Sequence, residues 1–107
     1  MNSLTNCVQR LEKDLDAALA RLIRMRSVRE AADTAPFGSG VKACLHEALN
    51  IAGELGFRTV NMQDYCGYAE YGDGQEMVMV LGHLDVVPEG EGWNQDTPPY
   101  GAVISDG

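Results

Sequence analysis

The residues best able to do chemistry in this sequence are His83 and Asp85, which stand two positions apart. If the backbone is extended there, both side chains point to the same side, because strand side chains alternate. A carboxylate beside an imidazole can accept one ring N–H and fix the tautomer, which leaves the other ring nitrogen free to bind a metal. The spacing alone is weak evidence, since a histidine at a strand end is more often a hydrogen-bonded structural residue than a ligand.

The run that precedes these residues predicts a central strand. Positions 77–81 are all apolar, which is typical of a strand buried on both faces, whereas a strand with one wet face alternates apolar and polar residues. Gly82, His83 and Asp85 follow at its carboxyl end. In open α/β sheets ligands bind at that end of the strands, so the sequence places a candidate site there.

Two amphipathic helices are expected before the strands. Residues 4–25 carry apolar side chains in steps of four and three, and about three heptads are short for a coiled coil, so we expect this face to pack on a sheet. Ser3 or Thr5 could cap its start. Residues 39–55 fit the same template, with Ser39 as the expected N-cap.

The ends of the second helix also carry signals. Gly56 is expected to adopt the left-handed conformation directly after the helix.

Residues 27–40, between the helices, contain turn residues and a proline and are predicted to form a loop. Phe37 in this loop is expected to anchor it on the core.

Three strands are predicted after the helices, over residues 57–62, 67–71 and 76–82. The second and third should pair as a hairpin around the Asp73-Gly74 turn signal. Residues 102–104 could form one more short strand. This order of elements does not complete a sheet, so the fold class is α/β, as the front part of a layer whose other elements lie downstream.

Composition narrows the possible partners and the compartment. The chain has 107 residues, enough for one domain at most, and a formal net charge of −8, which disfavours nucleic acid and anionic membranes as partners. Its three cysteines, Cys7, Cys44 and Cys66, show no disulfide or C-x-x-C pattern. No signal peptide and no membrane-spanning run is apparent. These features indicate a cytoplasmic protein.

Other polar residues favour structural interpretations. His46 lies off the apolar stripe of its helix and is expected on the surface, without a metal role. Glu89, Glu91 and Asp96 do not follow the EF-hand pattern, so a solvated loop is expected. Trp93 is expected to cover this loop rather than to stack on a substrate. The nearby glycines lack the context of a phosphate-binding loop.

A longer sequence motif around His83 strengthens the evidence that this residue has a function. Gly-His-Leu-Asp-Val-Val-Pro at 82–88, with Gly90, Gly92-Trp93, Asp96, Pro98-Pro99-Tyr100 and Asp106-Gly107 after it, resembles the opening of the co-catalytic zinc peptidases. That family includes aminoacylases, carboxypeptidase-G-like enzymes and bacterial dipeptidases. Residues 26–29, 35–38 and 66–70 are similar to its peptidase V branch, the Xaa-His dipeptidases. The resemblance extends from about residue 22 to the last residue.

The resemblance implies a partial three-layer zinc-peptidase catalytic domain. Residues 1–107 would be its N-terminal part, with two helices, a β-hairpin and a central strand, truncated before the sheet is complete. No lid or dimerisation domain would be included. The parent protein would hydrolyse dipeptides with a metal-activated water.

The resemblance also implies roles for the two candidate residues. His83 would ligate one zinc of a pair, for which cobalt or manganese could substitute, and Asp85 would be the catalytic-site carboxylate that orients His83. The bridging Asp, the general-base Glu and the other ligands would lie after Gly107, so the isolated chain is expected to be inactive. No substrate-binding residue is identified.

Two other functions stay open at this point. The parent could be an N-acyl-amino-acid deacylase or a carboxypeptidase of the same family, because the specificity residues would lie downstream. The chain could instead be a non-catalytic remnant that acts as an interaction module. An unpaired sheet edge would favour such association, including pairing with a second copy of the chain.

Overall fold

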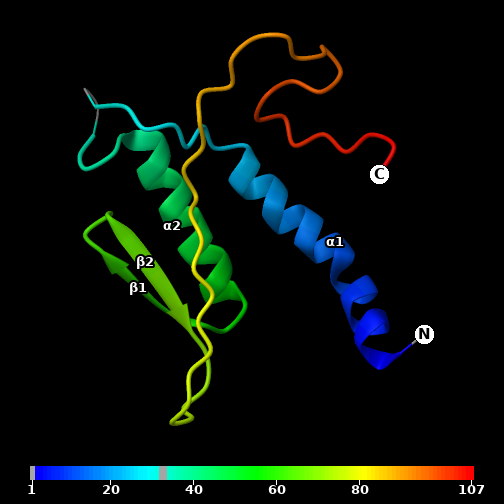
Figure 1. The fold of residues 1–107 in the computed structure, drawn as a ribbon, viewed down its shortest axis with the longest axis vertical. Helices are drawn as coiled ribbons and strands as arrows, with labels where there is room; N and C mark the ends of the chain where they lie inside the picture. The colour runs from blue at the N-terminus through cyan, green and yellow to red at the C-terminus, as the bar shows by residue number, and fades with distance from the viewer. Residues whose placement is uncertain (1, 32–33) are drawn as a thin grey trace.

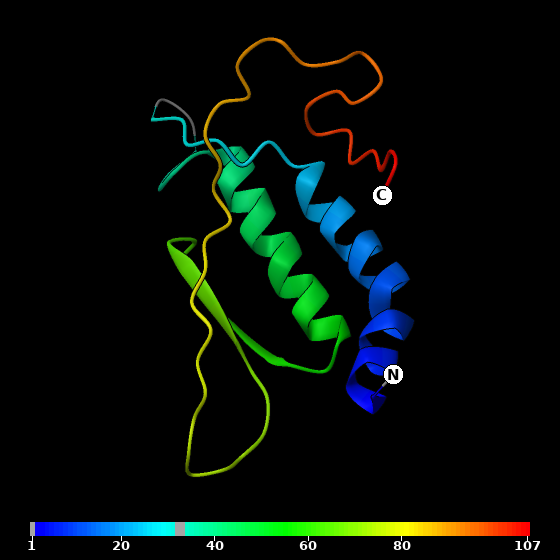
Figure 2. The same cartoon turned by 45° about the vertical axis from the view of Figure 1, so that its right-hand side comes forward.

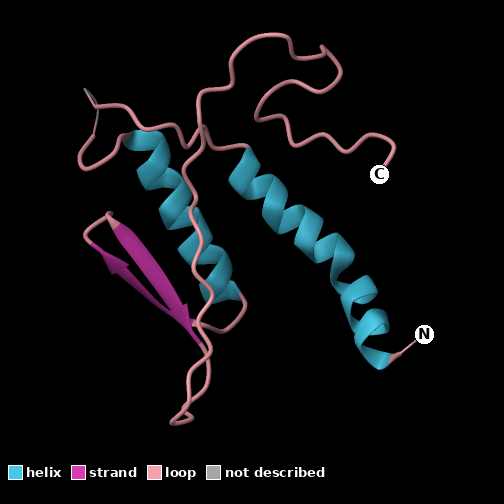
Figure 3. Cartoon of the chain, in the orientation of Figure 1, coloured by secondary structure: helices cyan, strands magenta, loops and turns pink. Residues whose placement is uncertain are grey.

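A computed structural model describes residues 2–31 and 34–107. Its elements are α1 (Ser3–Ile23), α2 (Ser39–Glu54), β1 (Arg58–Met62) and β2 (Cys66–Glu70), as Figure 1 shows. The two strands form one antiparallel sheet, so the chain is a small α/β arrangement that corresponds to part of a domain. After Glu70, the described residues contain no helix or strand (Figure 3).

Helix α1 begins at a side-chain cap that differs from the predicted one. The Oδ1 atom of Asn2 accepts hydrogen bonds from the backbone N–H and the hydroxyl of Thr5, both at 2.8 Å. The cap is therefore Asn2, and the prediction of Ser3 or Thr5 was wrong, because Thr5 is the donor in this interaction.

Helix α1 lies beside α2 rather than on a sheet (Figure 2). The Arg21 guanidinium joins the two helices through Glu47 at 2.6 Å and Glu54 at 2.6 and 3.0 Å. The apolar stripe of α1 remains largely exposed, with Leu4 at 71% and Leu15 at 63%. The prediction that this stripe packs on a sheet was wrong, because the two strands contact α2 alone.

Helix α2 carries both the expected end and an unexpected start. Gly38, with φ of 111°, occupies the N-cap position that we predicted for Ser39, so that prediction was wrong. Gly56 adopts a φ of 91°, as predicted. Its N–H donates to Gly53 O at 3.0 Å, and the Phe57 N–H donates to Ala52 O at 3.0 Å, which closes the helix end.

The loop between the helices is anchored through Phe37, which packs on the exposed Tyr65 rather than on the buried core that we predicted. The Phe37 ring is half-buried and packs edge-on against Tyr65, with 5.5 Å between ring centroids. The Arg29 guanidinium lies 5.9 Å from the Phe37 ring centroid. Part of the predicted loop, residues 32–33, lies outside the described residues.

Strands β1 and β2 form a hairpin in the register Arg58 to Glu70 and Met62 to Cys66. The turn between them places Asp64 at a φ of 63°, a conformation that aspartate tolerates better than most residues. The extents of these strands match the prediction closely. The predicted pairing of residues 67–71 with 76–82 was wrong, because residues 76–82 form no strand and the described sheet contains β1 and β2 alone.

The apolar run 77–81 is extended but is not part of the sheet. Val78 is 96% exposed and Val80 is 93% exposed, so the prediction of a buried central strand was wrong. The reason is that no described segment pairs with either edge of this run. Residues 102–104 likewise form no strand; they lie against the last turns of α1.

The core of the described residues is small. Val28, Cys44 and Ser27 are the buried side chains among the described residues. The surface of 8744 Å² exceeds the roughly 5,800 Å² of a compact protein of this mass. The radius of gyration, 16.3 Å, also exceeds the roughly 13 Å of a compact chain of this length. The arrangement is therefore open.

Neither described helix has the length and apolar character that crossing a membrane requires.

Candidate active site

The segment that carries His83 is docked on the link between the helices. The Ser27 hydroxyl donates to Leu84 O at 2.8 Å, and Ser27 O accepts from the Val86 N–H at 3.0 Å. Ser27 is 3% exposed, so these bonds are sheltered from water. Residues 84–86 are thereby fixed, although the run before them is exposed.

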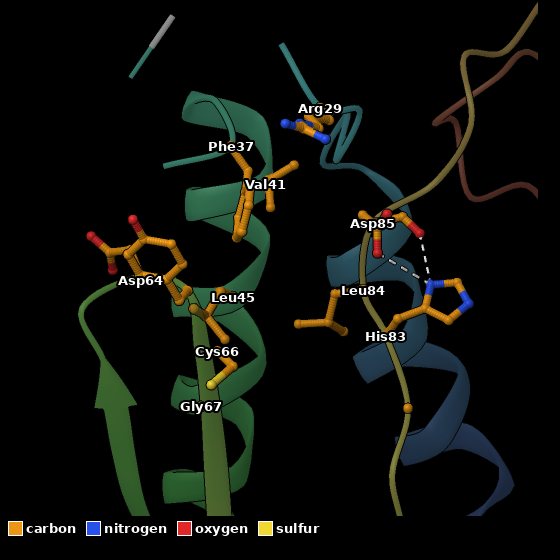
Figure 4. Close-up of a pocket in the computed structure, with 12 residues that line it drawn as sticks. Arg29, Phe37, Val41, Leu45, Asp64, Cys66, Gly67, His83, Leu84 and Asp85 are labelled. Atoms are coloured by element: carbon orange, nitrogen blue, oxygen red, sulfur yellow. Dashed lines mark hydrogen bonds and ion pairs between the residues drawn. The ribbon is translucent and has the colours of Figure 1, made fainter. Parts of the chain in front are cut away.

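His83 and Asp85 lie together on one side of this segment, as their spacing predicts. His83 Nδ1 is 2.9 Å from the Asp85 backbone oxygen and 3.4 Å from Asp85 Oδ1 (Figure 4). A carbonyl oxygen can only accept, so Nδ1 is the donor in this contact. A neutral ring then keeps the lone pair on Nε2. The nearer partner is thus the backbone carbonyl, whereas we expected the carboxylate.

The described residues do not complete a metal site. The side chains of His83 and Asp85 are 81% and 63% exposed. No group of three or more His, Cys, Asp or Glu residues in residues 2–31 and 34–107 is placed to hold a metal ion. A catalytic zinc site has three protein ligands, so one imidazole with one adjacent carboxylate does not fit a resident zinc by itself.

A hollow of about 530 Å³ lies between this segment and the α2–β2 face. Leu84 points into it, whereas the His83 ring is directed to the opposite side (Figure 4). The hollow is therefore a gap beside an unpaired segment, and His83 Nε2 does not open into it. The other residues around it are Arg29, Phe37, Val41, Leu45, Asp64, Tyr65, Cys66, Gly67, Gly82 and Asp85.

His46 has partners that its position in the sequence did not indicate. It is exposed, as predicted, but its Nε2 lies 2.6 Å from Asp64 Oδ1. Asn61 donates to the same oxygen at 2.7 Å, and Lys42 Nζ is 3.3 Å from the other carboxylate oxygen. The hydrogen bond from Asn61, followed by that of His46, lowers the pKa of Asp64 to about 2. This cluster ties α2 to the turn of the hairpin.

Glu89 also differs from the expected solvated residue. Its Oε2 accepts from the Tyr100 hydroxyl at 2.8 Å and from Arg26 Nε at 3.2 Å. Its backbone oxygen accepts from Trp93 Nε1 at 2.7 Å, so Trp93 is bonded into the loop that we expected it to cover. Glu91 and Asp96 are exposed, as predicted. No sequence signal pairs Arg26 with Glu89, because 63 positions separate them.

We expect the loop around Glu89 to release at low pH. Its own backbone N–H, the Tyr100 hydroxyl and the Arg26 guanidinium lower the pKa of Glu89 from 4.5 to about 2. A lowered pKa in the folded state stabilises the loop fully above about pH 4.5, and this stabilisation is lost as the pH falls toward 2. The fluorescence of Trp93, the only tryptophan, should therefore change within that window.

The Glu89→Gln variant provides the control for this titration. The amide keeps the shape of the side chain but cannot titrate, so its Trp93 fluorescence should stay flat between pH 4.5 and 2. Identical titrations of the two proteins would show that another carboxylate controls the loop.

Comparison with known proteins shows that most of the chain is similar in sequence to known proteins. No family model matches the sequence. The chain is similar to bacterial proteins named as dipeptidases. It is 38% identical over 103 residues to "Putative dipeptidase YtjP" of Bacillus subtilis (strain 168), a match that covers 94% of the chain and 22% of that protein.

A second relative shows the same proportions. The chain is 36% identical over 102 residues to "Putative dipeptidase SH1171" of Staphylococcus haemolyticus (strain JCSC1435), which covers 92% of the chain and 21% of that protein. The chain thus spans about a fifth of the length of the curated relatives it matches. It is similar to a small part of proteins that are much longer.

Proposed function

We propose that residues 1–107 form the N-terminal part of the catalytic domain of a zinc-dependent dipeptidase, in the peptidase V branch of the co-catalytic zinc peptidases. In the whole protein His83 Nε2 would bind one zinc, and Asp85 would hold the His83 ring. The observation that carries the proposal is the His83 geometry, with Nδ1 2.9 Å from a carbonyl oxygen, in a chain similar to dipeptidase-named proteins over 94% of its length.

The zinc would supply a Lewis acid and lower the pKa of a bound water, which generates the nucleophile for peptide hydrolysis. This chain contributes the orientation of one ligand, since the hydrogen bond at Nδ1 leaves Nε2 as the available nitrogen. The other ligands and the general base would come from the rest of the protein. We propose a cytoplasmic location, which the three free cysteines favour.

A chimera tests this proposal. In it, this chain replaces the matching segment of the Bacillus subtilis relative, and the unaltered relative is assayed in parallel. The chimera should hydrolyse dipeptides and lose this activity with a chelator, whereas the isolated 107-residue chain with added zinc should show no hydrolysis above buffer. The isolated chain should be inactive because its described residues do not supply the three protein ligands that a catalytic zinc ion requires.

Assaying the chimera with a panel of dipeptides and N-acetyl amino acids distinguishes the alternative functions. Faster hydrolysis of N-acetyl amino acids than of dipeptides such as β-Ala-His would support a deacylase of the same family. Zinc-dependent hydrolysis by the isolated chain would contradict our assignment of the missing ligands. A folded chimera that cleaves neither class would contradict the dipeptidase proposal.

A non-catalytic interaction module is the second candidate, and the exposure of residues 77–81 favours it. A partner strand could pair with this run, since its backbone edges have no partner in the described residues. A folded but inactive chimera would favour this function over the dipeptidase.

A further inference from the structure

We propose that Ser27 positions His83, by clamping the two peptide units on either side of Asp85. The catalytic consequence of this clamp rests on the function proposed above. The clamp itself is a property of this chain, and it can be measured without a metal or a substrate.

Both oxygens of Ser27 hold the segment. Its hydroxyl donates to Leu84 O at 2.8 Å, and its carbonyl accepts from the Val86 N–H at 3.0 Å. The Leu84 oxygen belongs to the peptide unit before Asp85, and the Val86 N–H belongs to the unit after it. One residue therefore restricts the backbone rotation on both sides of Asp85.

The second bond acts directly on the acceptor of His83. The Val86 N–H and the Asp85 carbonyl share one planar trans peptide unit, in which the two groups point in opposite directions. When Ser27 holds the N–H, the carbonyl must point away from Ser27. It meets His83 Nδ1 on that far side at 2.9 Å. Ser27 thus orients the carbonyl that places the proton on Nδ1 and leaves Nε2 available.

Ser27 can exert this control because it is itself held firmly. Its side chain is 3% exposed and lies beside Cys44 of α2, which is only 2% exposed. The backbone of α2 also approaches closely, since a Cβ added at Gly40 would lie 3.8 Å from the Ser27 Cα. Among the described residues, Ser27 supplies both recorded hydrogen bonds that tie residues 83–86 to the helical part of the chain.

The charged contacts nearby do not perform this role. Arg26 pairs with Glu89 at 3.2 Å and with Glu30 at 2.6 Å, which holds the loop after the segment. These ion pairs are partly exposed and touch neither His83 nor Asp85. Ser27 is therefore the residue whose replacement should change the His83 ring while the rest of the fold remains.

The test uses the 107-residue chain labelled with ¹⁵N, as the wild type and as the Ser27→Ala, Ser27→Thr and Ser105→Ala variants. Ser105 is an exposed serine outside the helices and strands, so its variant is the matched control. Two signals are read by NMR: the hydrogen exchange of the Val86 amide, and the ¹⁵N shifts of the His83 ring at about pH 8.5, where an ordinary histidine is neutral.

The wild type should show a protected Val86 amide and a proton on His83 Nδ1. Ser27→Ala removes the hydroxyl bond to Leu84 O and keeps the Ser27 carbonyl that accepts from the Val86 N–H. Because the segment is then held by one bond instead of two, exchange at Val86 should become about fivefold to tenfold faster, the equivalent of one net hydrogen bond. The His83 ring should shift toward the tautomer protonated on Nε2. Ser27→Thr keeps the hydroxyl and should restore both signals, and Ser105→Ala should match the wild type.

Three results would overturn the proposal. The first is a Val86 amide that exchanges in the wild type as fast as in a free peptide. The second is an unchanged His83 tautomer in Ser27→Ala. The third is loss of amide protection throughout α2 in Ser27→Ala, which would make Ser27 a general core residue.

The chimera separates this inference from the proposed function. There, Ser27→Ala should lower kcat about tenfold to a hundredfold with little change in KM, as expected for loss of an outer support of a metal ligand, and Ser27→Thr should restore it. An inactive chimera would contradict the proposed function and leave the NMR result standing. An active chimera that tolerates Ser27→Ala would overturn the positioning role alone.

Discussion

Replacing His83 with alanine in the chimera should release one zinc ion and lower dipeptide hydrolysis by more than about a hundredfold. Loss of an outer partner of a metal ligand typically costs about 10–100-fold, and loss of the ligand itself should cost more. His83 can have this effect because Nδ1 is already bonded to the Asp85 carbonyl, so that Nε2 is the nitrogen left to bind. Zinc content and kcat/KM together measure the result.

Two further variants make this a graded series. His46→Ala removes the other histidine of the chain, whose Nε2 is bonded to Asp64, and it should leave zinc content and activity within about twofold. Asp85→Asn keeps the backbone carbonyl that holds His83, so its loss should be intermediate, about 10–100-fold. Full zinc occupancy and full activity in His83→Ala would show that the metal uses other ligands.

The second large effect concerns Gly40 in the first turn of α2. A Cβ at this position would lie 2.0 Å from the Arg26 backbone oxygen, so Gly40→Ala must push α2 away from the link that carries Ser27. Forced overpacking of this kind costs about 1–3 kcal/mol. For a chain of this size, we expect the Tm to fall by more than about 4 °C, measured by circular dichroism.

Gly53 in the same helix provides the matched control. No atom lies within 4 Å of a Cβ added there, so Gly53→Ala only improves helix propensity. It should stabilise the chain by about 0.5–1 kcal/mol. The two identical substitutions in α2 should therefore have opposite signs. Equal rises in Tm would show that α2 does not approach Arg26 as closely as the structure indicates.

Several features of the chain follow from local patterns and were predicted from the residues alone. The 3.6-residue period of the apolar side chains identified both helices to within two residues, and Gly56 marked the end of the second. The side-by-side placement of His83 and Asp85 follows from the two-residue repeat of an extended backbone. Each of these features depends only on residues within a few positions in the sequence, so it can be predicted from the sequence alone.

Errors arose where a local pattern was used to infer a distant partner. The apolar composition of 77–81 is that of a buried strand, yet Val78 is 96% exposed because burial requires flanking strands and covering helices. The hairpin was assigned to the wrong pair for a related reason. Asp73-Gly74 was the only turn signal used, whereas the hairpin that forms turns at the residues around Asp64 and joins β1 to β2.

The sequence by itself thus determined the helices, the extents of the hairpin strands and the candidate residue pair. The tertiary structure alone decided what holds that pair in place. Ser27 lies 57 positions from Leu84, and Arg26 lies 63 positions from Glu89, so neither contact leaves a periodic or compositional signal. These contacts form because the packing of the helices places the link at Ser27 beside Cys44 of α2. This arrangement exists only in the folded chain.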